Sequence, residues 1–173
     1  MKRLIGILLC CALLCAAALA EGEGWTLDFD PNEAGYDGGW IGCESDGFKL
    51  YLPTGAQEIF GGADISCFAF SGGVLIIDRL AGTDMAERMN DVCGEGWRAA
   101  ALNGHEAALG FMKDTDNACM CWPEGDTLYH FLLAPAVAEG GSAAARAFAL
   151  RVLTSVRAMY NSFQGEEAQY EKM

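Results

Sequence analysis

Basic side chains are scarce in this chain of 173 residues. Eleven Lys and Arg and two His stand against 24 Asp and Glu, which gives a formal net charge of −13 at pH 7. A surface this acidic repels the phosphates of nucleic acids and the head groups of anionic lipids. The composition therefore argues against a nucleic acid as partner.

Long hydrophobic runs are absent after residue 20, so no later segment approaches the ~20 apolar residues of a membrane-spanning helix. The first 20 residues combine Lys2 and Arg3 with an apolar run and the small-residue pattern Ala18-Leu19-Ala20. This is the pattern of a secretory signal peptide. We predict cleavage after Ala20, which takes the net charge from −13 to −15. The product is expected to be secreted or at the cell surface, without inserting into a membrane.

The chain also lacks the short motifs of serine hydrolases, zinc proteases, phosphate-binding loops and dinucleotide-binding domains. This absence favours a non-enzymatic binding or interaction domain without a cofactor, whose partner is a protein or a small ligand. Tyr36, Trp40 and Tyr51 are candidates to line a ligand groove, because Trp and Tyr are favoured at binding surfaces. The alternative role for these three aromatic residues is to close the edge of a sheet.

Only four prolines occur, and no stretch reads as a linker between domains. About 150 residues after the signal suit a single domain with a core of its own. Residues 21–46 contain eight acidic side chains and no basic one. The predicted organisation is a signal peptide at 1–20, an acidic N-terminal arm at 21–46, one α+β domain at 47–163 and a polar tail at 164–173.

The region from Trp97 to Leu133 predicts four short strands joined by three tight turns. Asn103-Gly104 is typical of a hairpin turn, because a type I′ turn needs positive φ at both central residues. It places Leu102 opposite His105. Side chains alternate between faces with period two, so one face collects bulky residues: Leu109, Phe111, Met120, Trp122, Tyr129, Phe131 and Leu133. The other face collects mostly smaller residues: Trp97, Ala99, Ala108, Gly110, Cys119, Cys121, Leu128, His130 and Leu132.

Two helices are expected beside these strands. The first is short, Asp84–Cys93, with Thr83 or Asp84 as its N-cap and Gly94 after its end. The second is the longest, with Ser142 as its N-cap, and continues until Gly165. With earlier strands at Trp25–Asp30, Phe48–Leu52, Ala63–Phe70 and Val74–Leu80, the fold class is α+β. We predict an antiparallel sheet of about six to seven strands, packed by the long C-terminal helix and the short middle helix.

Five segments together resemble small exported bacterial proteins of the PsbP-like fold, an antiparallel sheet between helices. They are GFKLYLP (Gly47–Pro53), GGVLIIDRL (Gly72–Leu80), LNGHEAALGFM (Leu102–Met112), DTLYHFLLAP (Asp126–Pro135) and VLTSVR (Val152–Arg157). The resemblance covers about residues 46–160 and rests mostly on strands and turns. It implies a fold but no catalytic residue.

The strongest candidate for chemistry is the group Cys119, Cys121 and His130, predicted on one face with Cys119 directly opposite His130. Two thiolates and an imidazole can bind Zn or Cu, so a metal-binding or thiol-active protein is the alternative function. A Cys119–His130 dyad is a further hypothesis, in which His130 takes the thiol proton. The remaining explanation is that these are small buried residues beneath a helix. Cys119 and Cys121 are too far apart on one strand, ~6.5–7 Å between Cβ atoms, to bond each other.

Overall fold

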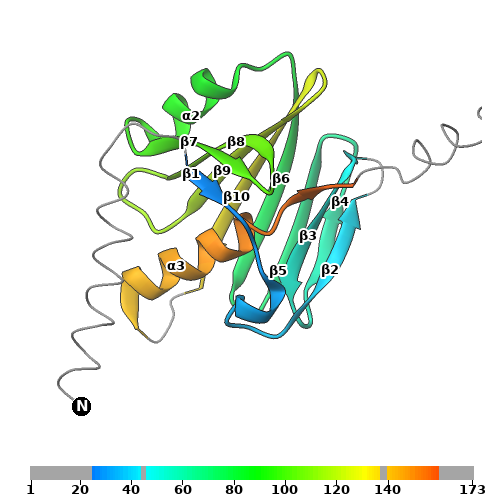
Figure 1. The fold of residues 1–173 in the computed structure, drawn as a ribbon, viewed down its shortest axis with the longest axis vertical. Coiled ribbons are helices and arrows are strands. Elements are labelled where there is room, and N and C mark those ends of the chain that lie inside the picture. Colours follow the sequence, from blue (N-terminus) through cyan, green and yellow to red (C-terminus); the bar gives the residue numbers. More distant parts are fainter. Residues whose placement is uncertain (1–24, 44–45, 137–139, 160–173) are drawn as a thin grey trace, which may run out of the picture.

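The structure is a computed structural model that describes residues 25–43, 46–136 and 140–159. Its strands form two sheets (Figure 1). The large sheet contains, in spatial order, β1 (Trp25–Leu27), β7 (Trp97–Leu102), β8 (His105–Phe111), β9 (Ala118–Glu124), β10 (Thr127–Pro135), β6 (Gly73–Ala81), β5 (Ile65–Phe70) and β4 (Gln57–Gly61). The small sheet contains β11 (Arg157–Ala158), β3 (Phe48–Pro53) and β2 (Gly38–Cys43).

The α+β class and the mostly antiparallel pairing are confirmed, but the expectation of one sheet with six to seven strands is wrong. The large sheet alone has eight strands, and three more form a second sheet. β1 pairs in parallel with β7, whereas the other strand pairs are antiparallel. β2 and β11 escaped prediction because each is defined by pairing with the distant β3 and carries no clear alternation of its own.

The main core lies on one face of the large sheet, where β3 and the helix α3 (Gly141–Leu153) cover it. β3 alternates strictly, so Phe48, Leu50 and Leu52 all point inward and are at most 1% exposed. They meet the bulky residues predicted for this face, including Trp122 and Phe131. The predicted division of side chains between the two faces is therefore confirmed.

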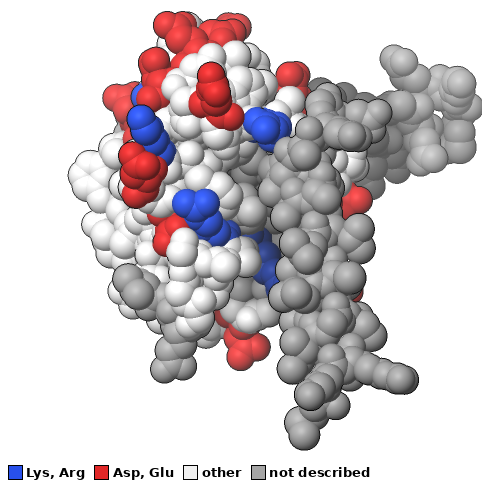
Figure 2. All heavy atoms as spheres, turned by 90° about the vertical axis from the view of Figure 1, so that its left-hand side faces the viewer, with Lys and Arg blue, Asp and Glu red and all other residues white. Residues whose placement is uncertain are grey.

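The opposite face carries the helix α2 (Met85–Cys93), which lies at the top of Figure 1. As predicted, Asp84 is its N-cap and accepts a hydrogen bond from the Glu87 amide at 2.8 Å, and Gly94 ends it at φ 60°. Acidic side chains gather at this same end of the molecule (Figure 2). Within the described ranges, no helix has the length and apolar character needed to cross a membrane.

The hairpin β7–β8 has the predicted register, with Leu102 opposite His105 and Trp97 opposite Gly110. Asn103 and Gly104 have φ values of 49° and 83°, as a type I′ turn requires. Trp97 packs closely over Gly110, where an added Cβ would lie 2.8 Å from the Trp97 Cβ. The missing side chain of Gly110 thus leaves the room that Trp97 needs on the neighbouring strand.

The predicted partner of His130 is wrong. The strands β9 and β10 continue to Glu124 and Thr127, so Gly125 and Asp126 alone form the turn. Cys121 therefore lies opposite His130, and Cys119 lies opposite Leu132. The shift is two residues, so every side chain keeps its predicted face. Proline has no backbone N–H to donate to a neighbouring strand. β9 can include Pro123 because its pairing with β8 already ends at Cys121.

The C-terminal helix is shorter than predicted, and its N-cap is Gly140 rather than Ser142. α3 ends at Leu153 because Ser155 accepts a hydrogen bond from the Tyr51 amide at 2.9 Å and donates one to the Val152 carbonyl at 2.6 Å. Arg157 then pairs with Lys49 as a strand. The rest of the predicted helix, residues 160–165, lies outside the described residues.

Candidate functional site

The predicted thiol and histidine group lies between α2 and the large sheet. Cys119 and Cys121 project from β9 and are fully buried, with Cys93 at the end of α2 beside them. His130 is 2% exposed on the neighbouring strand. The structure therefore brings the three predicted residues onto one buried face, and it adds Cys93, which the sequence did not single out.

His130 is held by a carboxylate from the adjacent strand and by an arginine from the helix above. Its Nδ1 lies 3.1 Å from Asp78 Oδ2 and 3.3 Å from Arg88 Nη2. Its Nε2 is buried and has no hydrogen-bond partner among the described residues. Burial lowers the pKa of His130, and the Asp78 carboxylate only partly opposes that effect. The imidazole is therefore neutral at pH 7.

The thiols of this cluster are poorly suited to nucleophilic catalysis. Burial raises the pKa of Cys121 to about 12. A hydrogen bond with Cys93 raises the pKa of Cys119, and the same bond lowers that of Cys93. A thiol must ionise to attack, so Cys119 and Cys121 are weak nucleophiles in the folded state. The Cys119–His130 dyad also loses its geometric basis, because Cys119 faces Leu132.

Metal coordination by these residues finds no support in their arrangement. In the described part of the chain, no three or more His, Cys, Asp or Glu side chains are placed to hold a metal ion. Binding of Zn or Cu by Cys119, Cys121 and His130 stays a prediction.

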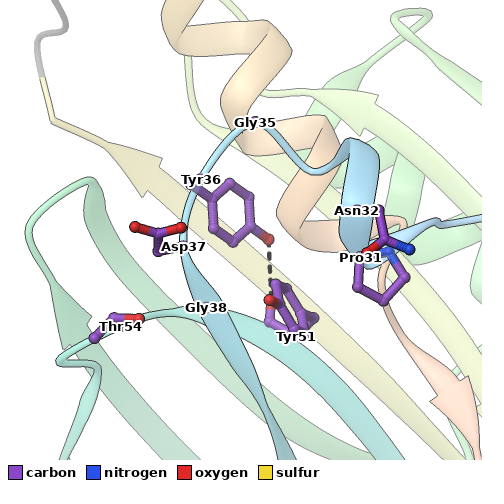
Figure 3. A pocket seen from close by; sticks show the side chains of 8 residues that line it. All are labelled: Pro31, Asn32, Gly35, Tyr36, Asp37, Gly38, Tyr51 and Thr54. Atoms are coloured by element: carbon purple, nitrogen blue, oxygen red, sulfur yellow. Dashed lines mark hydrogen bonds between the residues drawn. The ribbon is translucent and has the colours of Figure 1, made fainter.

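A second candidate site is an open pocket of about 640 Å³ beside the small sheet (Figure 3). Two tyrosines and several short polar residues line it: Pro31, Asn32, Gly35, Tyr36, Asp37, Gly38, Tyr51 and Thr54. The Tyr36 hydroxyl donates to the Tyr51 carbonyl oxygen at 3.0 Å, which fixes one aromatic ring relative to the other strand. The pocket is thus built where the segment before β2 meets β3.

The segment Pro31–Glu33 forms a single 3-10 turn that shapes one wall of the pocket. Asp30 caps it by accepting a hydrogen bond from the Asn32 amide at 2.8 Å. Arg151 of α3 donates to the Glu33 carbonyl at 2.7 Å, and a Cβ at Gly35 would lie 2.7 Å from its guanidinium. Gly35 also has φ 79°, so this position needs glycine for both space and backbone conformation.

The three aromatic residues singled out from the sequence lie together. Tyr51 is 5.8 Å from Tyr36 and 5.4 Å from Trp40, measured between ring centroids. Of the three, Tyr36 and Tyr51 line the pocket, whereas Trp40 lies beside the cationic groups of Lys49 and Arg157. Tyr36 also meets Phe148 of α3 at 5.6 Å. The rings therefore link α3 to the small sheet, and a ligand-binding role for them stays a prediction.

An acidic segment and one arginine surround the pocket, since Arg151 of α3 lies against Gly35. Residues 25–43 carry Asp28, Asp30, Glu33 and Asp37 without a single Lys or Arg. Burial, and then the neighbouring Tyr51, raise the pKa of Tyr36, so its phenol stays protonated and keeps its hydrogen bond at neutral pH. The pocket thus combines a carboxylate with neutral hydroxyl and amide groups.

Sequence reasoning missed a buried ion pair that joins the large sheet to the segment just before β3. Arg79 of β6 contacts the Asp46 carboxylate through two nitrogens, at 2.5 and 2.9 Å, and Asp46 is 7% exposed. The Tyr129 hydroxyl lies 3.4 Å from the same carboxylate. No local signal could have revealed this pair, because its members are 33 residues apart in the sequence.

No family model and no curated protein match the chain. Among solved structures, the Ran-binding protein Mog1p of Saccharomyces cerevisiae has 10% identity and a TM-score of 0.45, covering 72% of this chain and 96% of its own. Cyanobacterial PsbP from Synechocystis has 12% identity and a TM-score of 0.48, covering 70% and 92%. A Bacteroides thetaiotaomicron protein has 14% identity and a TM-score of 0.42, covering 66% and 46%. Membership of a PsbP-like family stays a prediction.

Proposed function

We propose that this protein is an exported, non-enzymatic binding domain whose pocket at Tyr36 and Tyr51 accepts a positively charged polar group. The group is an amine or a guanidinium, carried by a small ligand or by a side chain of a partner protein. The observation that carries the proposal is the open pocket of about 640 Å³ with a carboxylate and two tyrosines in its lining.

The chemistry of the lining supports a cation. Asp37 is an exposed residue of the pocket lining. Its carboxylate forms no ion pair within the described part of the chain. The Thr54 hydroxyl and the Asn32 amide oxygen add hydrogen-bond acceptors, and the rings of Tyr36 and Tyr51 supply aromatic surface. The net charge of −13 also attracts cations over longer distances.

The test is a titration of the ¹⁵N-labelled mature protein followed by NMR. One series uses spermidine, a second uses a short Lys- and Arg-containing peptide, and a third uses succinate as an anionic control. We expect shifts of the amides of Tyr36, Asp37 and Thr54 with the cationic probes only. Saturation by the peptide but not by spermidine would assign the cation to a protein partner.

Asp37→Asn is expected to weaken cation binding about two- to fivefold, since an exposed ion pair contributes up to about 1 kcal/mol. Asp64→Asn is the matched control, because it removes the same charge from the β4–β5 turn, outside the pocket lining. If both variants weakened cation binding equally, the effect would come from the net charge of the protein and not from the pocket. Amide shifts confined to other surfaces would show that the cation does not bind in the pocket.

A further inference from the structure

Two cysteines that are 26 positions apart meet beneath α2. Cys93 is the last residue of the helix, and Cys119 is the second residue of β9. Both thiols are buried, at 4% and 0% exposure, and belong to one packed cluster between α2 and the sheet. Within that cluster each of the two thiols shifts the pKa of the other through a hydrogen bond, so the side chains lie close together.

We propose that Cys93 and Cys119 form an intrachain disulfide when the protein is exported into an oxidising compartment. Disulfides persist in such compartments, and the predicted signal peptide directs the chain to one. Closing the contact to a bond of about 2.05 Å calls for movement of the two side chains on elements that already lie together. The proposal is independent of the ligand pocket.

Cys93 has two buried thiols in its cluster, Cys119 and Cys121, and of these Cys119 is the one that shares a hydrogen bond with it. The fold disfavours two other pairs among the described thiols. Cys121 lies two residues from Cys119 on the same strand, where the Cβ separation of ~6.5–7 Å exceeds the ~3.5–4.5 Å of a disulfide. Cys67 lies on β5, and both β10 and β6 stand between it and β9. At a spacing of ~4.8 Å per strand, Cys67 is ~14 Å from the strand of Cys119.

The surroundings of Cys93 explain how an oxidant reaches a buried thiol. Gly94, Glu95 and Gly96, which follow it, are all exposed. Two backbone hydrogen bonds hold this turn, from the Gly94 amide to Asn90 at 2.9 Å and from the Gly96 amide to Cys93 at 3.1 Å. Opening of the turn exposes Cys93 before any strand of the sheet is disturbed.

The oxidant is a disulfide, either of a small thiol such as glutathione or of an oxidising protein. The Cys93 thiolate attacks one sulfur of that disulfide, and the other sulfur leaves as a thiolate that takes up the proton from Cys93. Formation of the mixed disulfide removes the Cys93 thiol whose hydrogen bond raises the pKa of Cys119. The Cys119 thiolate then attacks the Cys93 sulfur of the mixed disulfide, and the second sulfur leaves and takes up the proton from Cys119. Two protein thiols are oxidised, and the oxidant is reduced to two thiols. The lowered pKa of Cys93 favours it as the first nucleophile.

The bond would fix the only described helix on this face of the sheet. α2 spans nine residues and is anchored mainly by Met89 and Cys93, both buried against β8 and β9. A cross-link from the end of α2 to the centre of the sheet restricts the unfolded chain across residues 93–119. Release of that bond by reduction should therefore lower the thermal stability of the protein.

The experiment is intact mass spectrometry of the mature protein after equilibration with glutathione disulfide, denaturation and alkylation. Five cysteines follow residue 20. We expect three to be alkylated and a peptide pair joined through Cys93 and Cys119. Cys121→Ala, the matched control, should keep the bond and show two alkylated thiols, whereas Cys93→Ala should show four. Reduction should lower the Tm of the wild type and of Cys121→Ala by about 5–10 °C, and leave that of Cys93→Ala unchanged.

Alkylation of all five wild-type cysteines after oxidation would overturn the proposal. So would a bond between Cys93 and Cys121 or between Cys119 and Cys121, or a disulfide-linked dimer in place of the intrachain bond. The wild-type measurement needs no variant to fold, so a misfolded Cys93→Ala chain would not obscure the result.

Discussion

At the scale of single residues, His130 is a titratable group held in the interior of the protein. It is 2% exposed, and its Nε2 has no partner within the described residues. Three charged or titratable groups face it: Asp78 on β6, Arg88 on α2 and the thiol of Cys121 across β9. Protonation would place a second cation beside Arg88, on a side chain that is almost fully buried.

The free energy of unfolding should therefore fall as the pH is lowered from 7 to 5. The unfolded chain takes up a proton at the ordinary histidine pKa near 6.5, whereas burial holds the pKa of folded His130 lower. The unfolded state then binds more protons in this window, which lowers stability by at most about 1.4 kcal/mol per pH unit. Urea unfolding of the wild type and of His130→Leu, measured at several pH values, checks this.

His130→Leu should flatten the dependence on pH, because it removes the titrating group while Asp78 and Arg88 remain as a pair. His105→Gln is the control, since it removes the other histidine and leaves His130 in place. Identical slopes for the wild type and His130→Leu between pH 7 and 5 would show that the pKa of His130 is the same in the folded and unfolded states.

At the scale of elements, the turn between β7 and β8 does more than reverse the chain. The Asn103 side chain accepts a hydrogen bond from the Phe29 amide at 3.2 Å and donates to the carbonyls of Val156 at 2.9 Å and Thr154 at 3.3 Å. Its own amide donates to Leu27 at 3.0 Å. One turn residue thus ties the N-terminal segment and the segment after α3 to the large sheet.

Two substitutions separate the conformation of Asn103 from its hydrogen bonds. Asn103→Gly keeps the positive φ of 49° but loses the side chain, and should cost about 2 kcal/mol of unfolding free energy. Asn103→Ala loses the same bonds and adds left-handed strain, for a total of about 3 kcal/mol. Urea denaturation gives both values. Equal costs would argue against strain at this turn, and a stable Asn103→Gly would argue against the hydrogen bonds.

The elements also show which parts of the fold can be read from the sequence. Asn103-Gly104 and the capping residue Asp84 act on their immediate neighbours, so the hairpin and α2 could be predicted from local pattern. The end of α3 could not, because Ser155 ends it through a hydrogen bond to Tyr51, 104 residues away. Likewise, the alternation of side chains along a strand predicts that Cys121 and His130 lie on one face. Their position directly opposite each other depends on the turn at Gly125, which the sequence did not specify.

At the scale of the whole molecule, the candidate pocket depends on contacts between distant segments. Residues 25–43, which fall within the predicted acidic arm, supply β1 to the large sheet and β2 to the small one. Phe29 is 6% exposed and Ala34 is 3% exposed, so this segment also contributes to the interior. Tyr36, Trp40 and Tyr51 were recognisable as candidates by type, but their assembly requires this pairing of β2 with β3.

Removal of residues 21–43 should therefore prevent cooperative folding. The deletion takes away β1 and β2, leaves β3 paired on one side only, and removes the buried residues Phe29 and Ala34 from the interior. A domain has a total stability of only about 5–15 kcal/mol, which the loss of two strands and these buried residues can exceed. Thermal unfolding followed by circular dichroism is the measurement, with deletion of the predicted polar tail, residues 164–173, as the control. An unchanged Tm after removal of residues 21–43 would show that the domain folds without the acidic arm. The pocket, part of whose lining lies in that arm, would then contribute nothing to the stability of the domain.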